Sequence, residues 1–179
     1  MANNQVIDRL LVVRAQAGEE AAFRTLFQLW NPKLLGFCLK LSGDQQAARD
    51  IAQETWVAVV KGLNRLEDPA RFRAWFFRIA HNKAADDIRA RQKHRKSEDA
   101  VKEMTELTAQ ERRPDEGLNL KTLIEALPRD KRSLLILFYV EGLTIPELAE
   151  VFKVPAGTVK SRLFNARAEL KTSYERKPS

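Results

Sequence analysis

The pattern of apolar and polar positions predicts helices along nearly the whole chain. Apolar residues recur at spacings of three and four, no stretch alternates strictly between apolar and polar, and glycine is scarce. We expect helices over 6–17, 19–41 with an interruption near Asn31 and Pro32, 45–63, about 68–91, 118–127, 129–140, 145–152 and from about 157 to 170. The predicted fold class is therefore all-α.

Three sequence signals place the starts of helices. Asp44 is a plausible N-cap for the helix over 45–63, and Asp68 followed by Pro69 is typical of a helix start. Thr144 and Glu147 have the spacing of a capping box, which predicts that the next helix begins directly after Thr144.

Charge divides the chain into three parts. The 179 residues carry a formal net charge of +7. Residues 1–96, 97–117 and 118–179 carry +7, −4 and +4 respectively. The acidic middle has no aromatic residue and ends in proline and glycine, as linkers do. We therefore predict two small helical domains, 1–96 and 118–179, joined by an acidic linker, with a polyanion as partner.

Several classes of protein are excluded by composition. The single Cys38 and the two histidines allow no disulfide framework and favour neither a metal site nor a cofactor site. The longest apolar run, 134–140, is far too short to span a membrane, and the N-terminus does not resemble a signal peptide. There is no glycine-rich phosphate loop and no nucleophile–base signature. We expect a cytoplasmic protein without a membrane span that is not an enzyme.

The helix over 45–63 has two contrasting faces. One face is apolar and consists of Ala48, Ile51, Ala52, Thr55, Trp56, Val59 and Leu63. The other carries Asp50 and Glu54, whose like charges at i and i+4 repel and do not favour the helix. This favours a docking stripe for a basic partner, although a merely solvated face is equally compatible with the periodicity.

The helix over 68–91 combines aromatic residues with cations. Phe72, Trp75, Phe76 and Phe77 lie within six residues, and nine Lys or Arg residues surround and follow them. Aromatic rings stack on unpaired bases while cations neutralise phosphates, so the composition favours single-stranded nucleic acid. The alternative is that the rings lie on one stripe and pack in the core, and for each ring taken singly core packing is the simpler interpretation.

The C-terminal helices predict a helix-turn-helix. The second of the pair, from about 157, would place Thr158, Lys160, Ser161, Phe164, Asn165 and Arg167 on its outer side or margins. Such side chains suit the major groove of duplex DNA. A helix pair with no role on DNA is the alternative.

Four motifs in order resemble the extracytoplasmic-function sigma factors of bacterial RNA polymerase. They are Ala48 to Trp56, Phe72 to Trp75 continuing through Arg78 to Asn82 and Asp86, Ala126 to Arg132, and Gly157 to Leu163 with Ala166 and Arg167. The similarity runs from about Glu19 to Leu170 without the linker. Asn165 stands at a position that is often basic in the family.

The resemblance implies a role for each segment. It implies that the first domain binds a coiled coil on the largest subunit of core RNA polymerase through Asp50, Gln53, Glu54 and Val57. It implies that the same domain recognises and melts the minus-ten element of promoter DNA, holding a flipped non-template base, through Arg71, Trp75, Arg78, Asn82, Lys83 and Asp86. It implies that the second domain reads the minus-35 duplex through Arg132, Thr158, Lys160, Ser161, Arg162, Phe164, Asn165 and Arg167.

The resulting expectation is an alternative sigma factor that directs core polymerase to specific promoters and assists their melting. The resemblance also implies control by an anti-sigma protein. Two other hypotheses remain: a sigma-like decoy that binds an anti-sigma factor without DNA, and a stand-alone duplex-binding regulator that uses only the C-terminal helices.

Overall fold

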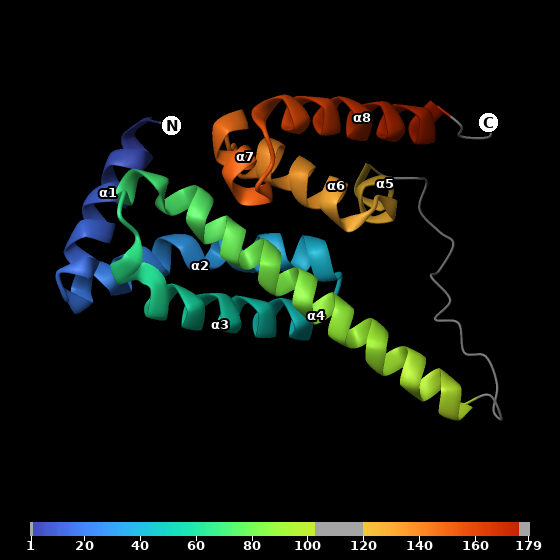
Figure 1. Ribbon diagram of the computed structural model, residues 1–179, viewed down its shortest axis with the longest axis horizontal. Helices are drawn as coiled ribbons and strands as arrows, with labels where there is room; N and C mark the ends of the chain where they lie inside the picture. Colours follow the sequence, from blue (N-terminus) through green and yellow to red (C-terminus); the bar gives the residue numbers. More distant parts are fainter. Residues whose placement is uncertain (1, 103–119, 176–179) are drawn as a thin grey trace.

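The computed structural model describes the backbone of residues 2–102 and 120–175, and side chains within 6–91 and 122–175. Every regular element in these ranges is helical, which confirms the predicted fold class (Figure 1). The helices are α1 (Ala2–Gln16), α2 (Glu20–Ser42), α3 (Gln45–Gly62), α4 (Phe72–Lys102), α5 (Leu120–Ala126), α6 (Arg129–Leu135), α7 (Ile145–Phe152) and α8 (Ala156–Glu175). Two 3₁₀ turns, Leu63–Arg65 and Pro69–Arg71, connect α3 to α4, and a π-helical turn, Ile136–Val140, extends α6.

The helix starts lie where the capping residues predict them. The Asp44 carboxylate accepts a hydrogen bond from the Ala47 N–H at 2.7 Å and so caps α3. Thr144 and Glu147 form the reciprocal capping box of α7. Gly43 ends α2 with φ of 70°, a left-handed conformation that costs glycine least.

Helix α2 continues through Pro32, so the interruption expected there is wrong. A proline inside a helix removes one backbone hydrogen bond and costs about 3 kcal/mol. Leu26 and Trp30 before it, and Leu34 and Phe37 after it, are all buried. Burying each such side chain contributes roughly 1.5–3 kcal/mol, so packing of the continuous helix outweighs the cost of the proline.

Helix α4 is longer than the sequence pattern predicts. It continues past Arg91 to Lys102, and so enters the segment expected to be a linker. The rest of that segment, residues 103–117, lies outside the described residues.

Trp30 is at the centre of the N-terminal core. Its ring lies 5.3 Å from the Phe72 ring, 5.2 Å from Phe76 and 5.9 Å from Phe77, centroid to centroid, mostly edge to face. The Trp30 indole N–H donates to the Asp8 carboxylate of α1 at 2.9 Å. One residue of α2 thus joins α4 and α1 in a single core.

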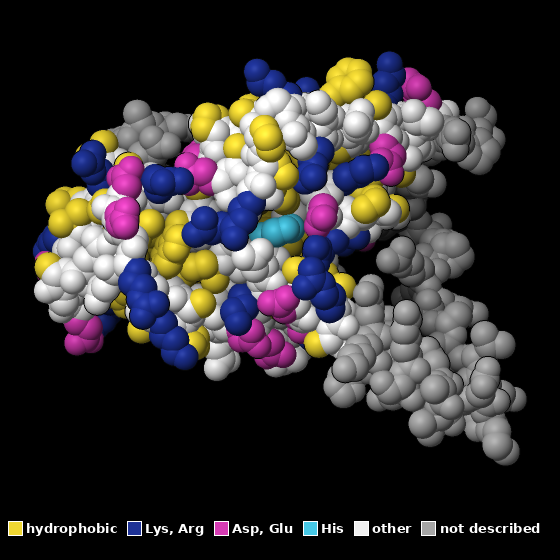
Figure 2. All heavy atoms as spheres, viewed as in Figure 1, with side chains coloured by type: hydrophobic (Ala, Val, Ile, Leu, Met, Phe, Trp, Pro, Cys, Tyr) yellow, Lys and Arg dark blue, Asp and Glu magenta, His cyan; other side chains and the backbone are white. Residues whose placement is uncertain are grey.

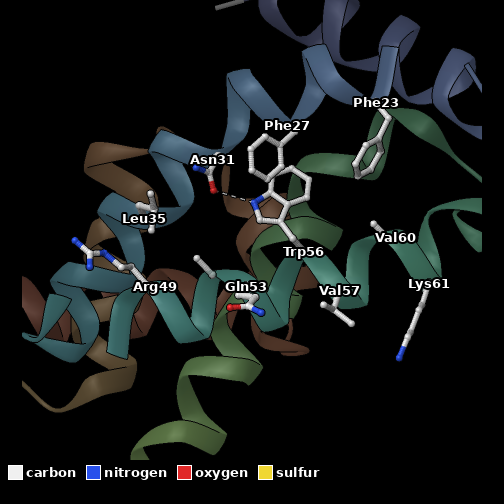
Figure 3. Close-up of a pocket in the computed structure, with 11 residues that line it drawn as sticks. Phe23, Phe27, Asn31, Leu35, Arg49, Gln53, Trp56, Val57, Val60 and Lys61 are labelled. Atoms are coloured by element: carbon white, nitrogen blue, oxygen red, sulfur yellow. Dashed lines mark hydrogen bonds between the residues drawn. The ribbon is translucent and has the colours of Figure 1, made fainter. Parts of the chain in front are cut away.

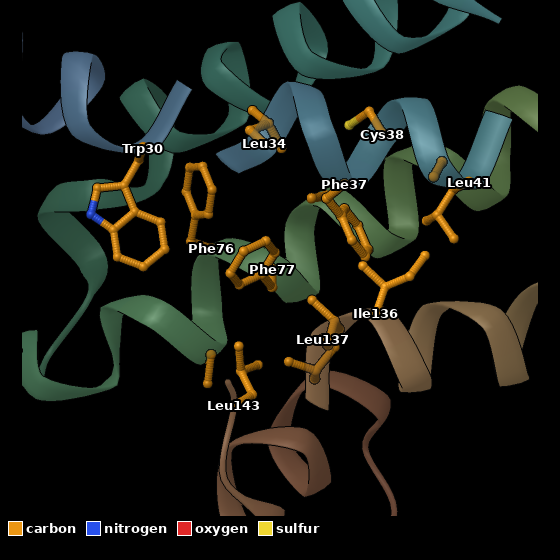
Figure 4. Close-up of a cluster of buried hydrophobic side chains, with 14 of the residues drawn as sticks. Trp30, Leu34, Phe37, Cys38, Leu41, Phe76, Phe77, Ile136, Leu137 and Leu143 are labelled. Atoms are coloured by element: carbon orange, nitrogen blue, oxygen red, sulfur yellow. The ribbon is translucent and has the colours of Figure 1, made fainter. Parts of the chain in front are cut away.

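The two parts of the chain predicted as separate domains pack against each other. Helix α7 contacts α4, and α6 with its π-helical turn contacts α2. In Figure 4, Ile136, Leu137 and Leu143 approach Phe37 and Phe77, and all five belong to one continuous buried cluster. Helix α8 lies on the outer side of α6 and α7, away from α2 and α4 (Figure 1).

Candidate functional site

The predicted docking stripe on α3 is exposed, and the face opposite to it is buried. Asp50, Gln53, Glu54 and Val57 are accessible to solvent, whereas the seven residues predicted for the apolar face are all buried. Asp50 accepts a hydrogen bond from the Gln46 amide at 2.9 Å. Glu54 pairs with Lys83 of α4 at 3.1 Å, so one residue predicted for polymerase binding contacts one predicted for promoter binding.

An apolar groove lies beside this stripe, between α2 and α3. Its volume is about 540 Å³, and it is lined by Phe23, Phe27, Asn31, Leu35, Arg49, Ala52, Gln53, Trp56, Val57, Val60 and Lys61. Figure 3 shows Phe27 and Phe23 beside the Trp56 indole, and Val57, Val60 and Lys61 following along α3. Val57 is 48% exposed and Val60 60%, so two aliphatic side chains at the mouth of the groove remain largely in water.

Trp56 forms the floor of the groove and is packed against residues of α2. Its ring lies 4.8 Å from Phe27 and 6.0 Å from Phe23, and its N–H donates to the Asn31 side-chain oxygen at 3.1 Å. The α2 side of the groove was missed by sequence reasoning. The available signal was Phe23 and Phe27, one helical turn apart on α2.

The segment between α3 and α4 brings three predicted minus-ten residues together. Arg71, Trp75 and Arg78 line a hollow of about 230 Å³ together with Arg65, Leu66, Glu67, Asp68 and Glu150. A Cβ placed on Gly62 would lie 3.0 Å from the Trp75 ring, so glycine permits this close packing.

Gln16, at the end of α1, fixes the same segment. Its amide donates to the Leu63 and Leu66 carbonyls, each at 2.8 Å. Sequence reasoning missed this residue, because no local pattern indicates a bond to a turn so far along the chain.

The remaining minus-ten candidates lie further along α4. Asn82 and Asp86 are exposed, and Asp86 pairs with Arg89 at 3.3 Å. Of the four clustered aromatic residues, Phe72, Phe76 and Phe77 are buried in the core, and only Trp75 is partly accessible. For those three rings the core interpretation is confirmed, which leaves Trp75 as the one ring of the four that solvent can reach.

Carboxylates of the C-terminal part of the chain, residues 120–175, contact the arginines Arg71 and Arg73 near the start of α4. Glu150 of α7 pairs with Arg71 at 3.0 Å, and Glu147 with Arg73 at 3.7 Å; Arg73 also donates to the Glu141 carbonyl. The hydrogen bond and negative charge of Glu150 raise the pKa of Arg71. On the face shown in Figure 2, basic and acidic side chains alternate across the middle of the molecule instead of forming one basic field.

A buried polar contact joins α4 to α6. His81 Nδ1 lies 3.0 Å from the Ser133 hydroxyl, its Nε2 lies 3.9 Å from Asp130, and its ring packs on Phe152 with centroids 4.9 Å apart. Burial lowers the pKa of His81; Arg129 adds to this shift and Asp130 opposes it. The neutral imidazole is therefore the form that this contact favours.

Arg132, predicted to contact phosphate, is engaged inside the protein. Its guanidinium donates to the Leu127 carbonyl at 3.1 Å, to that of Glu125, and to the Leu41 carbonyl of α2 at 3.3 Å. A contact between Arg132 and phosphate would require these bonds to change.

Helices α7 and α8 form the helix-turn-helix. Lys153 adopts a left-handed conformation, with φ of 53°, at the turn. Leu148 and Val151 of α7 are buried against Val159 and Leu163 of α8. The outer side of α8 presents the predicted residues Lys160, Ser161, Phe164 and Asn165 to solvent, with Thr158, Arg162 and Arg167 at its flanks.

Two family models match the chain. The Sigma-70 region 2 model matches residues 26–94, and the Sigma-70 region 4 model matches residues 117–170. The RNA polymerase sigma-H factor of Pseudomonas aeruginosa is 32% identical over 173 residues, which cover 89% of this chain and 90% of that protein. The chain belongs to the extracytoplasmic-function sigma factors. It therefore directs promoter-specific initiation of transcription by RNA polymerase.

Other relatives agree with this assignment. The extracytoplasmic-function sigma-E factor of Escherichia coli K12 is 29% identical over 184 residues, covering 92% of this sigma factor and 93% of that protein. The solved structure of CnrH in complex with the cytosolic domain of CnrY is 26% identical, with a TM-score of 0.72, covering 96% of this chain and 99% of that chain.

Two structural features of this sigma factor lie before the first matched residue. Gln16 and Phe23 both precede residue 26, yet Gln16 holds the loop before α4 and Phe23 lines the groove.

Among the described residues of the sigma factor, no group of His, Cys, Asp and Glu could hold a metal ion. No helix in that part of the chain is long and apolar enough to cross a membrane.

Proposed function

We propose that residues 1–96 bind core RNA polymerase and the minus-ten element, and that residues 118–179 bind the minus-35 element. In this proposal, residues 97–117 connect the two functions. The whole chain acts in the cytoplasm, as a subunit with no catalysis of its own. The observation that carries the proposal is the combination, on α3, of an exposed polar stripe with the apolar groove at its edge.

The polymerase dock consists of Asp50, Gln53, Glu54 and Val57 with the groove beside them. Interfaces gain most from apolar anchors that enter pockets, while charged residues at the rim set orientation and association rate. The groove with Trp56 at its floor offers such a pocket, and Val57 and Val60 lose water when a helix of the polymerase coiled coil lies along α3. The carboxylates of Asp50 and Glu54 then face basic side chains of the partner.

The minus-ten surface consists of the hollow at Arg71, Trp75 and Arg78 and of the α4 face carrying Asn82, Lys83 and Asp86. Arginines hold phosphates, Trp75 stacks on an unpaired base, and the Asn82 amide binds a base edge. Capture of unstacked bases supplies free energy for opening without nucleotide hydrolysis.

Full engagement of the minus-ten element requires the two units to separate at α7. Glu150 and Glu147 occupy Arg71 and Arg73 in the described arrangement. Phosphates of the promoter strand compete with these carboxylates for the same guanidinium groups.

An anti-sigma protein is the further partner that we propose. The relative CnrH is solved in complex with the cytosolic domain of CnrY. The groove beside α3 is accessible and apolar, so a protein that inserts an apolar helix there would compete with core polymerase.

Three measurements test the proposal. A pull-down with purified core polymerase tests docking, permanganate footprinting of the holoenzyme tests opening, and titration of the holoenzyme with a minus-35 duplex tests duplex binding. Asn82→Ala should reduce opening more than core binding. Lys160→Ala should weaken minus-35 duplex binding, whereas Lys171→Ala, which removes an exposed lysine further along the same helix, should not. Equal loss of core affinity in the Asn82 and Lys160 variants would show that the assigned roles are wrong.

The two alternative hypotheses make different predictions. A decoy that binds only an anti-sigma factor would give no promoter binding with core polymerase. A stand-alone regulator would keep regulated transcription after Asp50→Ala and Glu54→Ala are combined, whereas a sigma factor that docks through α3 would lose it.

A further inference from the structure

The outer face of α8 carries few lysine or arginine side chains that could contact base edges. Val159, Leu163 and Ala166 face the core, so the helical period places Ser161, Phe164 and Asn165 on the opposite side. Phe164 is 71% exposed, an unusually open position for a large ring. Lys160 lies at the margin of this face, where it is exposed and makes no hydrogen bond or ion pair with another described residue.

Both arginines of α8 lie at the flanks of this outer face. The Arg167 guanidinium lies over the Phe138 ring at 5.7 Å and over the Tyr139 ring at 5.4 Å. Arg162 lies on the other flank, where it lines a hollow together with Asp130 of α6. Arginines at the flanks of the helix are placed to contact phosphates at the groove edges and not base edges at its centre.

Of the three outward side chains, Asn165 and Phe164 suit the two different bases of an A·T pair. The Ser161 hydroxyl is already satisfied by the Gly157 carbonyl at 3.1 Å. The Asn165 amide makes no hydrogen bond in the part of the chain that the structure describes. A carboxamide matches the N6 donor and N7 acceptor of adenine in the major groove, and an aromatic ring packs on the methyl group of thymine.

We propose that Asn165 and Phe164 make the minus-35 element of this sigma factor specific for A·T base pairs at two neighbouring positions. Asn165 contacts an adenine through N6 and N7, and Phe164 packs on a thymine methyl of an adjacent pair. Lys160, Arg162 and Arg167 contribute affinity through phosphates without base preference. This inference rests on the proposed entry of α8 into the major groove.

The experiment uses the full chain assembled with core polymerase. Selection from a pool of promoters with a randomised minus-35 segment gives the preferred duplex, and each adenine and thymine in it is then changed singly. Replacing the critical adenine by 7-deazaadenine removes only the N7 acceptor, and replacing the critical thymine by deoxyuridine removes only the methyl group.

We expect each base change to weaken binding of the wild-type holoenzyme, and each variant to lose sensitivity to the base change that it matches. An exchange of the critical A·T pair weakens wild-type binding roughly 5- to 150-fold. The deoxyuridine substitution weakens it about fourfold, the contribution of one buried methyl group. Asn165→Ala becomes insensitive to 7-deazaadenine, Phe164→Ala becomes insensitive to deoxyuridine, and Asn165→Arg changes the preference at the same position to G·C, since arginine matches guanine.

Two different failures are distinguishable. A holoenzyme that selects a minus-35 duplex but has no A·T preference, or whose preference survives Asn165→Ala and Phe164→Ala, overturns this inference and leaves the proposed function standing. A holoenzyme that selects no minus-35 sequence overturns both. Lys171→Ala serves as the control variant, because it removes an exposed side chain of α8 far from the turn.

Discussion

Val57→Asp should weaken binding to core polymerase strongly while leaving the fold intact. Val57 is 48% exposed, so about half of its apolar surface is still available for burial in a complex. Full burial of a valine contributes roughly 1.5–3 kcal/mol, so the remaining half contributes about 1 kcal/mol. A carboxylate left without a partner in an apolar contact costs about 1–3 kcal/mol more.

The combined loss of about 2–4 kcal/mol corresponds to a dissociation constant raised roughly 30-fold or more. The matched control is Val13→Asp, because Val13 on α1 is 47% exposed but lies outside the groove. Fluorescence titration of labelled chain with core polymerase gives both constants, and thermal melting should change little for either variant. Unchanged affinity of Val57→Asp, or an equal loss in Val13→Asp, would refute the assignment of the groove to the dock.

Three further predictions concern other parts of the fold. Gln16→Leu leaves the Leu63 and Leu66 carbonyls without their donor, at a cost of roughly 1–3 kcal/mol, so minus-ten opening by permanganate footprinting should fall while core affinity is unchanged; reduced core affinity would contradict this. Because the pKa of His81 is lowered in the folded chain, the unfolded chain binds more protons when the pH falls below the ordinary value of 6.5. The free energy of unfolding, measured by urea titration, should therefore fall as the pH drops through 6.5, and His81→Gln should flatten that slope. A slope unaltered in the variant would be the opposing result. Burial raises the pKa of the Cys38 thiol to about 12, so iodoacetamide at about pH 8 should label the unfolded chain and not the native one, whereas rapid native labelling would mean that the thiol is accessible.

The parts of the fold that depend on local chemistry could be predicted from the sequence. The two faces of α3 follow from helical periodicity, and the starts of α3 and α7 follow from Asp44 and from the Thr144–Glu147 pair. Each is decided by residues within one or two turns of each other, which is the range that a sequence pattern reports.

Features decided by distant packing were not predictable in the same way. The continuity of α2 through Pro32 depends on a core shared with α4, and the groove needs Phe23 beside Trp56 of another helix. The side chains of Arg132 and Arg167 could be identified as basic, but their engagement by carbonyls and by aromatic rings follows only from tertiary contacts. The contact of α7 with Arg71 and Arg73 also joins residues that no short-range pattern relates.

Run-off transcription with purified core polymerase, on a promoter selected by the holoenzyme, tests most directly whether this chain is a sigma factor that docks through α3. We expect transcripts from core plus the wild-type chain, almost none from core alone, strongly reduced transcripts from core plus Val57→Asp at equal concentration, and wild-type levels with Val13→Asp. Absence of stimulation by the wild-type chain, together with no binding to core, would show that the chain does not act as a sigma factor.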